Sequence, residues 1–300
     1  MHKLTLTAIL SVVLFGATFA QTDSYPRAVQ QWRAAHEKQL RSEDDWLSLV
    51  GLFWLKPGVN TVGAGNKYDI ALTNSFTAGK FGEIVLSQHG AVLTLEHGVR
   101  ALSAGAKIST LTGEQILEPV ALEPDDPGPA TQIRVGTQTF YVIKRDGKFG
   151  IRLKDSLSPS RINFKGEKWY PVDSRYRVTA DYEPYPEPRP VKVPNVLGGD
   201  FDYKAPGLLH FKLEGKDYTL MPVIEGDHLF IIFRDLTSRS ETYGAGRFLY
   251  APVAKDGKVI LDFNKAENPP CAFTDFATCP LPPQQNRLDL AIPAGEKRNH

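Results

Sequence analysis

Repeated hairpin signals constrain the fold of this chain more than any other feature of its sequence. Runs of alternating apolar and polar residues are separated by tight turns in which glycine follows an acidic residue or histidine, a pattern typical of β-hairpins. These turns lie at His89-Gly90, Asp146-Gly147, Glu214-Gly215, Glu225-Gly226 and Asp256-Gly257. They predict a mainly β fold, an antiparallel barrel or sandwich built from hairpins, with N-terminal α-helices packed against it.

The predicted helices lie near the start of the chain. Apolar residues recur at helical spacing between residues 25 and 40, which predicts one amphipathic helix. Ser42 and Asp45 stand at capping-box spacing and predict a second short helix from Trp46 to Val50. The apolar run at 52–55 is expected in the core, because aromatic clusters dominate protein cores.

Two proline-rich segments interrupt the strand pattern, at Glu118–Ala130 and Tyr182–Gly199. The first is either a linker or a long surface loop. We favour the loop, because neither half of the chain contains a self-contained set of elements. The prediction is therefore one domain over residues 21–300, with a helical N-terminus at 25–55 and a β-rich body at 59–300. The second segment is expected to lie extended on the surface in a polyproline-like form.

The first 20 residues have the pattern of a secretory signal peptide. Lys3 precedes an apolar run from Leu4 to Phe15, and small residues lead to Ala20, after which cleavage is expected. The alternative is a retained N-terminal anchor, although the apolar run is short for a membrane span. The pattern predicts residues 1–20 as signal peptide, a periplasmic or secreted protein, and no membrane span after cleavage.

The charge balance argues against nucleic acid as a partner. The chain has 35 Lys and Arg against 34 Asp and Glu, and removal of the signal peptide takes away only Lys3. Without a basic excess, nothing steers the protein to nucleic acid or to an anionic membrane surface.

The segment at residues 262–283 is expected to form an ordered, irregular loop. It contains both cysteines of the chain, two Pro-Pro pairs and three phenylalanines, so no regular helix or strand fits it. Ordered loops on rigid scaffolds often carry functional sites. In an oxidising compartment, Cys271 and Cys279 are predicted to form a disulfide that closes a short loop.

Polar residues that could carry chemistry gather in the C-terminal half. Arg247 is expected either to form a buried ion pair with Asp235 or Asp262, which we favour, or to grip a carboxylate or phosphate of a ligand. Gly244 and Gly246 indicate a tight turn rather than a phosphate loop, because a strand follows them and no GK[ST] is present.

Other common chemistries find no support in the sequence. The histidines show neither HxH nor HExxH spacing, and no GxSxG occurs, so no metal, cofactor or serine nucleophile is predicted. Cys271 is a poor candidate nucleophile, because pairing with Cys279 would remove its free thiol.

Four segments, at 44–63, 161–173, 242–252 and 261–288, resemble the bacterial family called domain of unknown function 1684. The resemblance covers almost the whole mature chain and implies a shared architecture and site, without a reaction. Glu267 departs from the family pattern, where an aromatic residue is expected before Asn-Pro-Pro. The matching positions are Arg161, Trp169, Tyr170, Tyr243, Gly244, Gly246, Arg247, Asp262, Asn264, Asn268, Cys271, Cys279 and Asn286.

These observations predict a protein that binds a small polar or anionic ligand in a pocket closed by residues 262–283. The expected ligand-binding residues are Arg161, Tyr170, Tyr243, Arg247, Asn264 and Asn268. One alternative is a hydrolase that uses Asp262 or Asp235 as a general base. Another is a structural or partner-binding envelope protein, which would expose an apolar patch in place of a pocket. The sequence does not identify a protein partner.

Overall fold

The computed structural model describes residues 24–73, 79–104, 114–115 and 118–299. The predicted signal peptide lies outside these residues. Within them the fold is mainly β and contains two α-helices, α1 (Ser24–Leu40) and α2 (Pro159–Ile162). The predicted mainly β class and the N-terminal helix are therefore confirmed.

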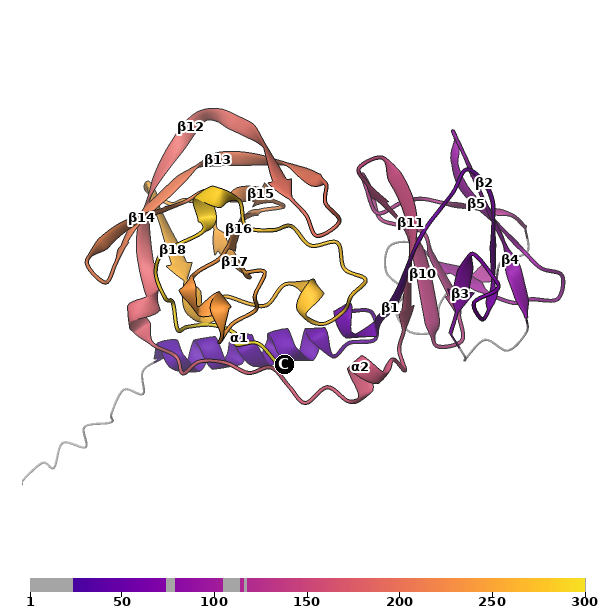
Figure 1. Ribbon diagram of the computed structural model, residues 1–300, viewed down its shortest axis with the longest axis horizontal. Coiled ribbons are helices and arrows are strands. Elements are labelled where there is room, and N and C mark those ends of the chain that lie inside the picture. The colour runs from indigo at the N-terminus through magenta and orange to yellow at the C-terminus, as the bar shows by residue number, and fades with distance from the viewer. Residues whose placement is uncertain (1–23, 74–78, 105–113, 116–117, 300) are drawn as a thin grey trace, which may run out of the picture.

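The strands form four hydrogen-bonded sheets, which Figure 1 shows in two lobes. In the N-terminal lobe one sheet has the order β1 (Leu49–Trp54), β11 (Lys148–Asp155), β10 (Gln138–Arg145), β9 (Gln132–Val135), β6 (Leu102–Ala104) and β7 (Glu114–Gln115). The other has the order β3 (Ile70–Leu72), β2 (Gly58–Ala64), β4 (Lys80–Ser87), β5 (Gly90–Leu95) and β8 (Val120–Leu122).

The C-terminal lobe contains the other two sheets. One has the order β14 (Lys216–Leu220), β13 (Asp200–Leu213), β12 (Arg177–Pro194) and β18 (Lys258–Asp262). The other has the order β15 (Val223–Glu225), β16 (His228–Phe233) and β17 (Arg247–Pro252). All described pairs are antiparallel except that between β2 and β3.

Each lobe has a hydrophobic core of its own. Phe81, Ile84 and Phe140 are buried in the N-terminal lobe. Phe233 and Phe263 are buried in the C-terminal lobe, with their ring centroids 5.5 Å apart. Two separate cores leave the surfaces where the lobes meet free to carry polar groups. The predicted single domain stays a prediction.

Helix α1 begins the described chain but packs along the base of the C-terminal lobe (Figure 1). The Arg33 side chain donates hydrogen bonds to the backbone oxygens of Tyr170 and Asn264, both at 2.9 Å. The Tyr25 hydroxyl donates to Asp262 Oδ1 at 2.6 Å. From its C-terminal end the chain enters β1 of the N-terminal lobe, so α1 ties the two lobes together.

The predicted second helix is wrong beyond a single turn. Asp45 caps a 3-10 turn at Trp46–Ser48 by accepting a hydrogen bond from the Trp46 backbone amide at 2.6 Å. The chain then becomes β1, which pairs with β11. Pairing with a distant strand overrides the local capping signal. Trp54, expected in the core, is 41% exposed.

Four predicted hairpins are present, as β4–β5, β10–β11, β13–β14 and β15–β16. The fifth is wrong, because the strands on either side of Asp256-Gly257 join different sheets. β17 pairs with β16, and β18 pairs with β12. Asp256 and Gly257 do form a turn, with φ of +51° and +69°, but the strands on either side of it pair with strands that are distant in sequence.

The extended, polyproline-like form predicted for 182–199 is also wrong, because most of this segment is the long strand β12, paired with β13. β12 pairs with β18 only over Arg177–Asp181, and between Tyr182 and Pro194 this edge of β12 has no further strand partner among the described residues. Proline lacks an N–H and is tolerated on such an edge. A shift of register between Pro184 and Arg189 absorbs the most proline-rich part.

Candidate functional site

A cavity of about 760 Å³ lies where the two lobes meet. The N-terminal lobe contributes Arg152 and the turn after β10, and the C-terminal lobe contributes the start of β13 and the end of β15. Eight of its lining residues belong to the 262–283 segment: Glu267, Asn268, Pro270, Phe273, Ala277, Thr278, Cys279 and Pro280. The segment that the sequence singled out is thus one wall of the cavity.

Arg152 is the most deeply buried arginine that lines this cavity. The residue is 5% exposed and sits on β11 between the buried Ile151 and Leu153. Its Nη2 donates to Thr278 Oγ1 at 2.9 Å, while its buried Nε has no hydrogen-bond partner. Among the described residues no carboxylate lies within ion-pairing distance of it. A buried guanidinium without a counter-charge can bind an anionic group.

Arg152 is also packed between two cavities. Its guanidinium carbon lies 5.2 Å from the centre of the Trp46 ring. A second cavity of about 700 Å³ shares Asp45, Trp46 and Arg152 with the first. The guanidinium is therefore accessible to a ligand although it is almost entirely withdrawn from bulk water.

Aromatic rings form much of the opposite wall. Tyr250 stacks on Phe230, with centroids 4.8 Å apart and an interplanar angle of 12°. Tyr203 and Phe248 contact the same Phe230 ring edge-on, at 6.4 and 4.8 Å. Such walls suit apolar or aromatic portions of a ligand, while a few polar groups fix its orientation.

His36 of α1 lines the cavity and is held between two carboxylates. Its Nδ1 lies 2.8 Å from Glu167 Oε1, and its Nε2 lies 3.1 Å from Glu267 Oε2. Burial alone lowers the pKa of His36, but these two hydrogen bonds outweigh burial and raise the pKa to about 11. His36 is therefore cationic at neutral pH, and both of its ring nitrogens are already paired with carboxylates.

A third carboxyl group, that of Glu296, lies near Glu167 and Glu267 and is fully buried. Its Oε2 accepts a hydrogen bond from the Asn268 backbone amide at 2.7 Å. Burial and the neighbouring Glu167 raise the pKa of Glu296 to about 8, so it is protonated at neutral pH.

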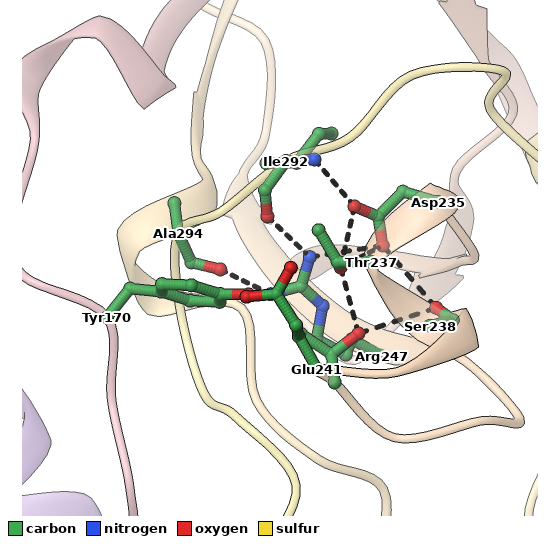
Figure 2. A network of polar contacts seen from close by, with 9 residues as sticks. Tyr170, Asp235, Thr237, Ser238, Glu241, Arg247, Ile292 and Ala294 are labelled. Carbon is green, nitrogen blue, oxygen red and sulfur yellow. Dashed lines mark hydrogen bonds and ion pairs between the residues drawn. The ribbon is translucent and has the colours of Figure 1, made fainter.

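Arg247, predicted as a ligand-binding residue, is instead the centre of a buried structural network (Figure 2). It is fully buried, and its Nη2 donates to Ile292 O at 3.0 Å and to Asp235 Oδ1 at 3.3 Å. Nη1 donates to Ala294 O. The geometry matches the buried ion pair with Asp235 that the sequence analysis favoured.

Asp235 and Tyr170 belong to the same region. Asp235 also accepts hydrogen bonds from Thr237 Oγ1 at 2.9 Å and from the Ile292 backbone amide at 2.7 Å. The Tyr170 hydroxyl donates to Glu241 at 2.8 Å. Neither Asp235 nor Tyr170 lines the cavity.

The second predicted aspartate lies in a different network. Asp262 caps a 3-10 turn at Phe263–Lys265 by accepting from the Asn264 backbone amide at 3.3 Å. The Asn264 side chain donates to Asp173 O at 2.8 Å and to the Tyr25 hydroxyl at 2.9 Å. Asp262 and Asn264 thus fasten α1 to the C-terminal lobe and do not line the cavity.

Three other predicted ligand-binding residues are divided between the cavity and the scaffold. Asn268 lines the cavity, and its Oδ1 is buried without a partner. The Tyr243 hydroxyl donates to Cys271 O at 2.9 Å. Arg161 donates from Nε to Arg41 O at 2.8 Å and from Nη1 to Ser156 O at 2.7 Å, away from the cavity.

The remaining positions of the family resemblance have contacts within the scaffold. Trp169 packs edge-on against Trp32, with centroids 5.9 Å apart. The Asn286 side chain donates to Met221 O at 2.9 Å and to Ile232 O at 3.0 Å. Gly246 has a φ of +113°, and a Cβ there would lie 2.5 Å from Phe233 O. Gly246 therefore occupies the tight turn predicted for it.

The predicted disulfide is not present, because Cys271 and Cys279 are both free thiols. The eight-residue spacing does bring them together, and the Cys271 backbone amide donates to Cys279 Sγ at 3.1 Å. The two thiols interact through hydrogen bonds, and their sulfur atoms are not at the short distance of a disulfide bond. The hydrogen bond to Cys271 and burial raise the pKa of the Cys279 thiol.

Within the described residues, no group of three or more His, Cys, Asp or Glu side chains is arranged to hold a metal ion. In the same part of the chain, every helix is too short or too polar to cross a membrane.

Sequence reasoning missed Arg152, because alternation along β11 places it opposite Ile151 and Leu153, on the face that is normally solvated. Trp46 and, from the other lobe, Thr278 cover the Arg152 side chain on that face. For Glu267 a signal did exist, since the resemblance leads us to expect an aromatic residue at its position. The structure shows it at the cavity wall, paired with His36.

Comparison with known protein families identifies the family of this protein. The family described as "Protein of unknown function (DUF1684)" matches residues 162–297, and the chain belongs to this family. The match begins at the last residue of α2 and includes the sheets of the C-terminal lobe and the 262–283 segment, whereas the 44–63 segment lies outside it.

Among solved structures, an uncharacterized protein of Haloarcula marismortui, determined by solution NMR, is 33% identical to this chain. The alignment covers 46% of this chain and 78% of that protein, with a TM-score of 0.39. No curated protein matches the chain.

Proposed function

We propose that the protein binds a small polar or anionic ligand in the cavity between its lobes, with Arg152 as the anchor for an anionic group. The observation that carries this proposal is Arg152, a 5% exposed residue that lines the cavity, with a buried Nε that has no hydrogen-bond partner and no ion pair with any residue that the structure describes. Burying an uncompensated charge is costly, so such a group is kept where a ligand supplies its partner.

The cavity also has the size and lining expected of a ligand site. Its volume of about 760 Å³ lies within the range of roughly 300–1,000 Å³ typical of small-molecule pockets. Aromatic walls and a few placed polar groups complete that description. The 262–283 segment covers one side of the cavity, and the barrel or sandwich form predicted from the hairpins remains part of this proposal.

The proposed setting is the periplasm or the extracellular space, after cleavage of residues 1–20. This rests on the sequence of the N-terminus alone. The signal-peptide pattern there is a basic residue, an apolar run and a small residue at the cleavage position.

The alternatives have less support. A hydrolase with Asp235 or Asp262 as general base requires one of them beside the ligand, and neither lines the cavity. A purely structural or partner-binding protein would not need, at a cavity wall, a buried arginine that has no carboxylate partner among the described residues.

A thermal-shift screen of the purified protein against small carboxylates and phosphate esters tests the proposal. A ligand at 100 times its Kd stabilises the native state by about 2.7 kcal/mol, a shift that is easily measured. The shift should disappear in Arg152→Met and persist in Arg175→Met, which removes an equally charged but 77% exposed side chain. Circular dichroism verifies that both variants are folded.

Two results would count against the proposal. If wild type and Arg152→Met are stabilised equally by the same compound, Arg152 is not the anchor. If no compound stabilises folded wild-type protein, the structural or partner-binding alternative takes precedence.

A further inference from the structure

Beyond the anion site, several carboxylates line the cavity, among them Glu225. Glu225, at the end of β15, belongs to the C-terminal lobe, whereas Arg152 belongs to the N-terminal lobe. Among the described residues no basic side chain forms an ion pair with Glu225, and the neighbouring Tyr250 hydroxyl partly offsets the rise in the pKa of its carboxyl that desolvation causes. Arg152 and Glu225 thus have opposite charges, lie on different lobes and form no ion pair among the described residues.

Further carboxylates reinforce the negative side. Asp126 and Asp146 of the N-terminal lobe and Asp200 of the C-terminal lobe line the cavity without an ion-pair partner among the described residues. Arg145, a nearby cation, is already held by Asp125 through two hydrogen bonds at 2.8 and 2.7 Å. Because like charges from both lobes converge here, a cationic group between them would relieve their repulsion.

Aromatic faces stand beside Glu225. Tyr250 stacks on Phe230, and Tyr203 packs on the same ring. Desolvation first, and then the charge of Glu225, raise the pKa of Tyr203 to about 12, which places this phenol within electrostatic reach of the carboxylate. Although Glu225 as a whole residue is exposed, desolvation also raises the pKa of its carboxyl. A carboxylate beside aromatic faces is a suitable site for an ammonium group.

We propose that the cavity binds a zwitterion with separated charges, and specifically a short peptide of about two or three residues with free ends, as its size allows. The inference rests on the proposed function at Arg152. The peptide carboxylate binds Arg152, the terminal ammonium binds Glu225, and side chains contact the aromatic wall.

Calorimetric titration with three tripeptides tests this assignment. Free Ala-Phe-Ala carries both charges, its N-acetyl form lacks the ammonium, and its C-terminal amide lacks the carboxylate. We expect the free peptide to bind, and each modification to weaken binding at least about tenfold, the loss that corresponds to one charge-assisted contact of about 1.4 kcal/mol.

Variants assign each charge to its partner. Glu225→Gln should weaken binding of the free peptide to the level of the N-acetyl peptide and leave the N-acetyl peptide unaffected. Arg152→Met should weaken binding of the free peptide to the level of the C-terminal amide, and it should leave binding of the amide unaffected. Glu214→Gln, at the hairpin turn between β13 and β14 outside the cavity lining, should bind the free peptide as wild type does.

The outcomes separate this inference from the proposed function. If the N-acetyl and free peptides bind equally well, the zwitterion assignment is overturned while the anion site stands. If no tripeptide binds but a small carboxylate or phosphate does so through Arg152, the peptide class is overturned and the proposed function stands. If neither the tripeptides nor the small anions bind folded protein, both are overturned.

Discussion

Asp235→Ala should destabilise the protein strongly, because it leaves the guanidinium of Arg247 buried without a counter-charge. Arg247 is fully buried, and without Asp235 it keeps only the carbonyl oxygens of Ile292 and Ala294. The substitution also removes the acceptor for the Ile292 backbone amide, now at 2.7 Å.

The expected loss follows from these contacts. Breaking a buried ion pair by removing one partner costs about 3–5 kcal/mol. A buried amide left without an acceptor adds roughly 1–3 kcal/mol, although part of each cost is recovered if water enters or the loop relaxes. We therefore expect Asp235→Ala to lower the free energy of unfolding by about 4 kcal/mol or more.

Urea unfolding followed by circular dichroism measures this loss. Asp181→Ala is the matched control, because it breaks an ion pair with Lys258 in which the Asp181 side chain is 70% exposed. Exposed pairs contribute about 0–1 kcal/mol. Combined with Arg247→Met, Asp235→Ala should cost less than the sum of the single losses by about 2 kcal/mol, because the two residues act as a pair.

One result would refute this reasoning. If Asp235→Ala lowers the free energy of unfolding by no more than Asp181→Ala does, another group compensates the charge of Arg247. The ligand-binding role predicted for Arg247 from the sequence would then return, in place of the structural role.

Two further predictions follow from other buried positions. In Glu296→Gln, stability measured by urea unfolding should fall less between pH 5 and pH 8 than in wild type. The pKa of Glu296 rises from 4.5 in the unfolded chain to about 8 when it is buried, so its contribution is present below pH 4.5 and lost as pH rises through 8. The difference is on the order of 4 kcal/mol, and parallel pH profiles of variant and wild type would contradict it. Gly246→Ala should cost at least about 2 kcal/mol more than Gly257→Ala. Both glycines have positive φ, but only at Gly246 would a Cβ meet neighbours, 2.5 Å from Phe233 O and 2.6 Å from Pro282 Cγ. Equal losses in thermal melts would show that the turn at Gly246 relaxes freely.

Local signals predicted local structure well in this protein. Helix α1 follows from apolar spacing, and four hairpins follow from their turns, because in each case the interacting residues are close in sequence. The prolines and phenylalanines of the 262–283 segment predict an ordered loop without a regular ladder, and the segment lines the cavity; that the cavity is a functional site stays a prediction.

The site residues could not be predicted because they depend on contacts between distant parts of the chain. Arg152 and Thr278, which are hydrogen-bonded at 2.9 Å, are 126 residues apart in sequence. Arg247 and Asn264 attracted attention as polar residues in a distinctive motif, yet both are used to hold buried backbone in place. A polar motif alone does not distinguish a residue that binds a ligand from one that supports the scaffold.

Fluorescence of Trp46 tests the central claim most directly. Of the four tryptophans of the chain, Trp46 is the one that lines the cavity, and its ring packs against Arg152. Titration with a compound that stabilises the protein should change the tryptophan emission of wild type, and the change should vanish in Trp46→Phe although the compound still stabilises that variant. A change of the same size in Trp46→Phe would place the ligand elsewhere and contradict the account.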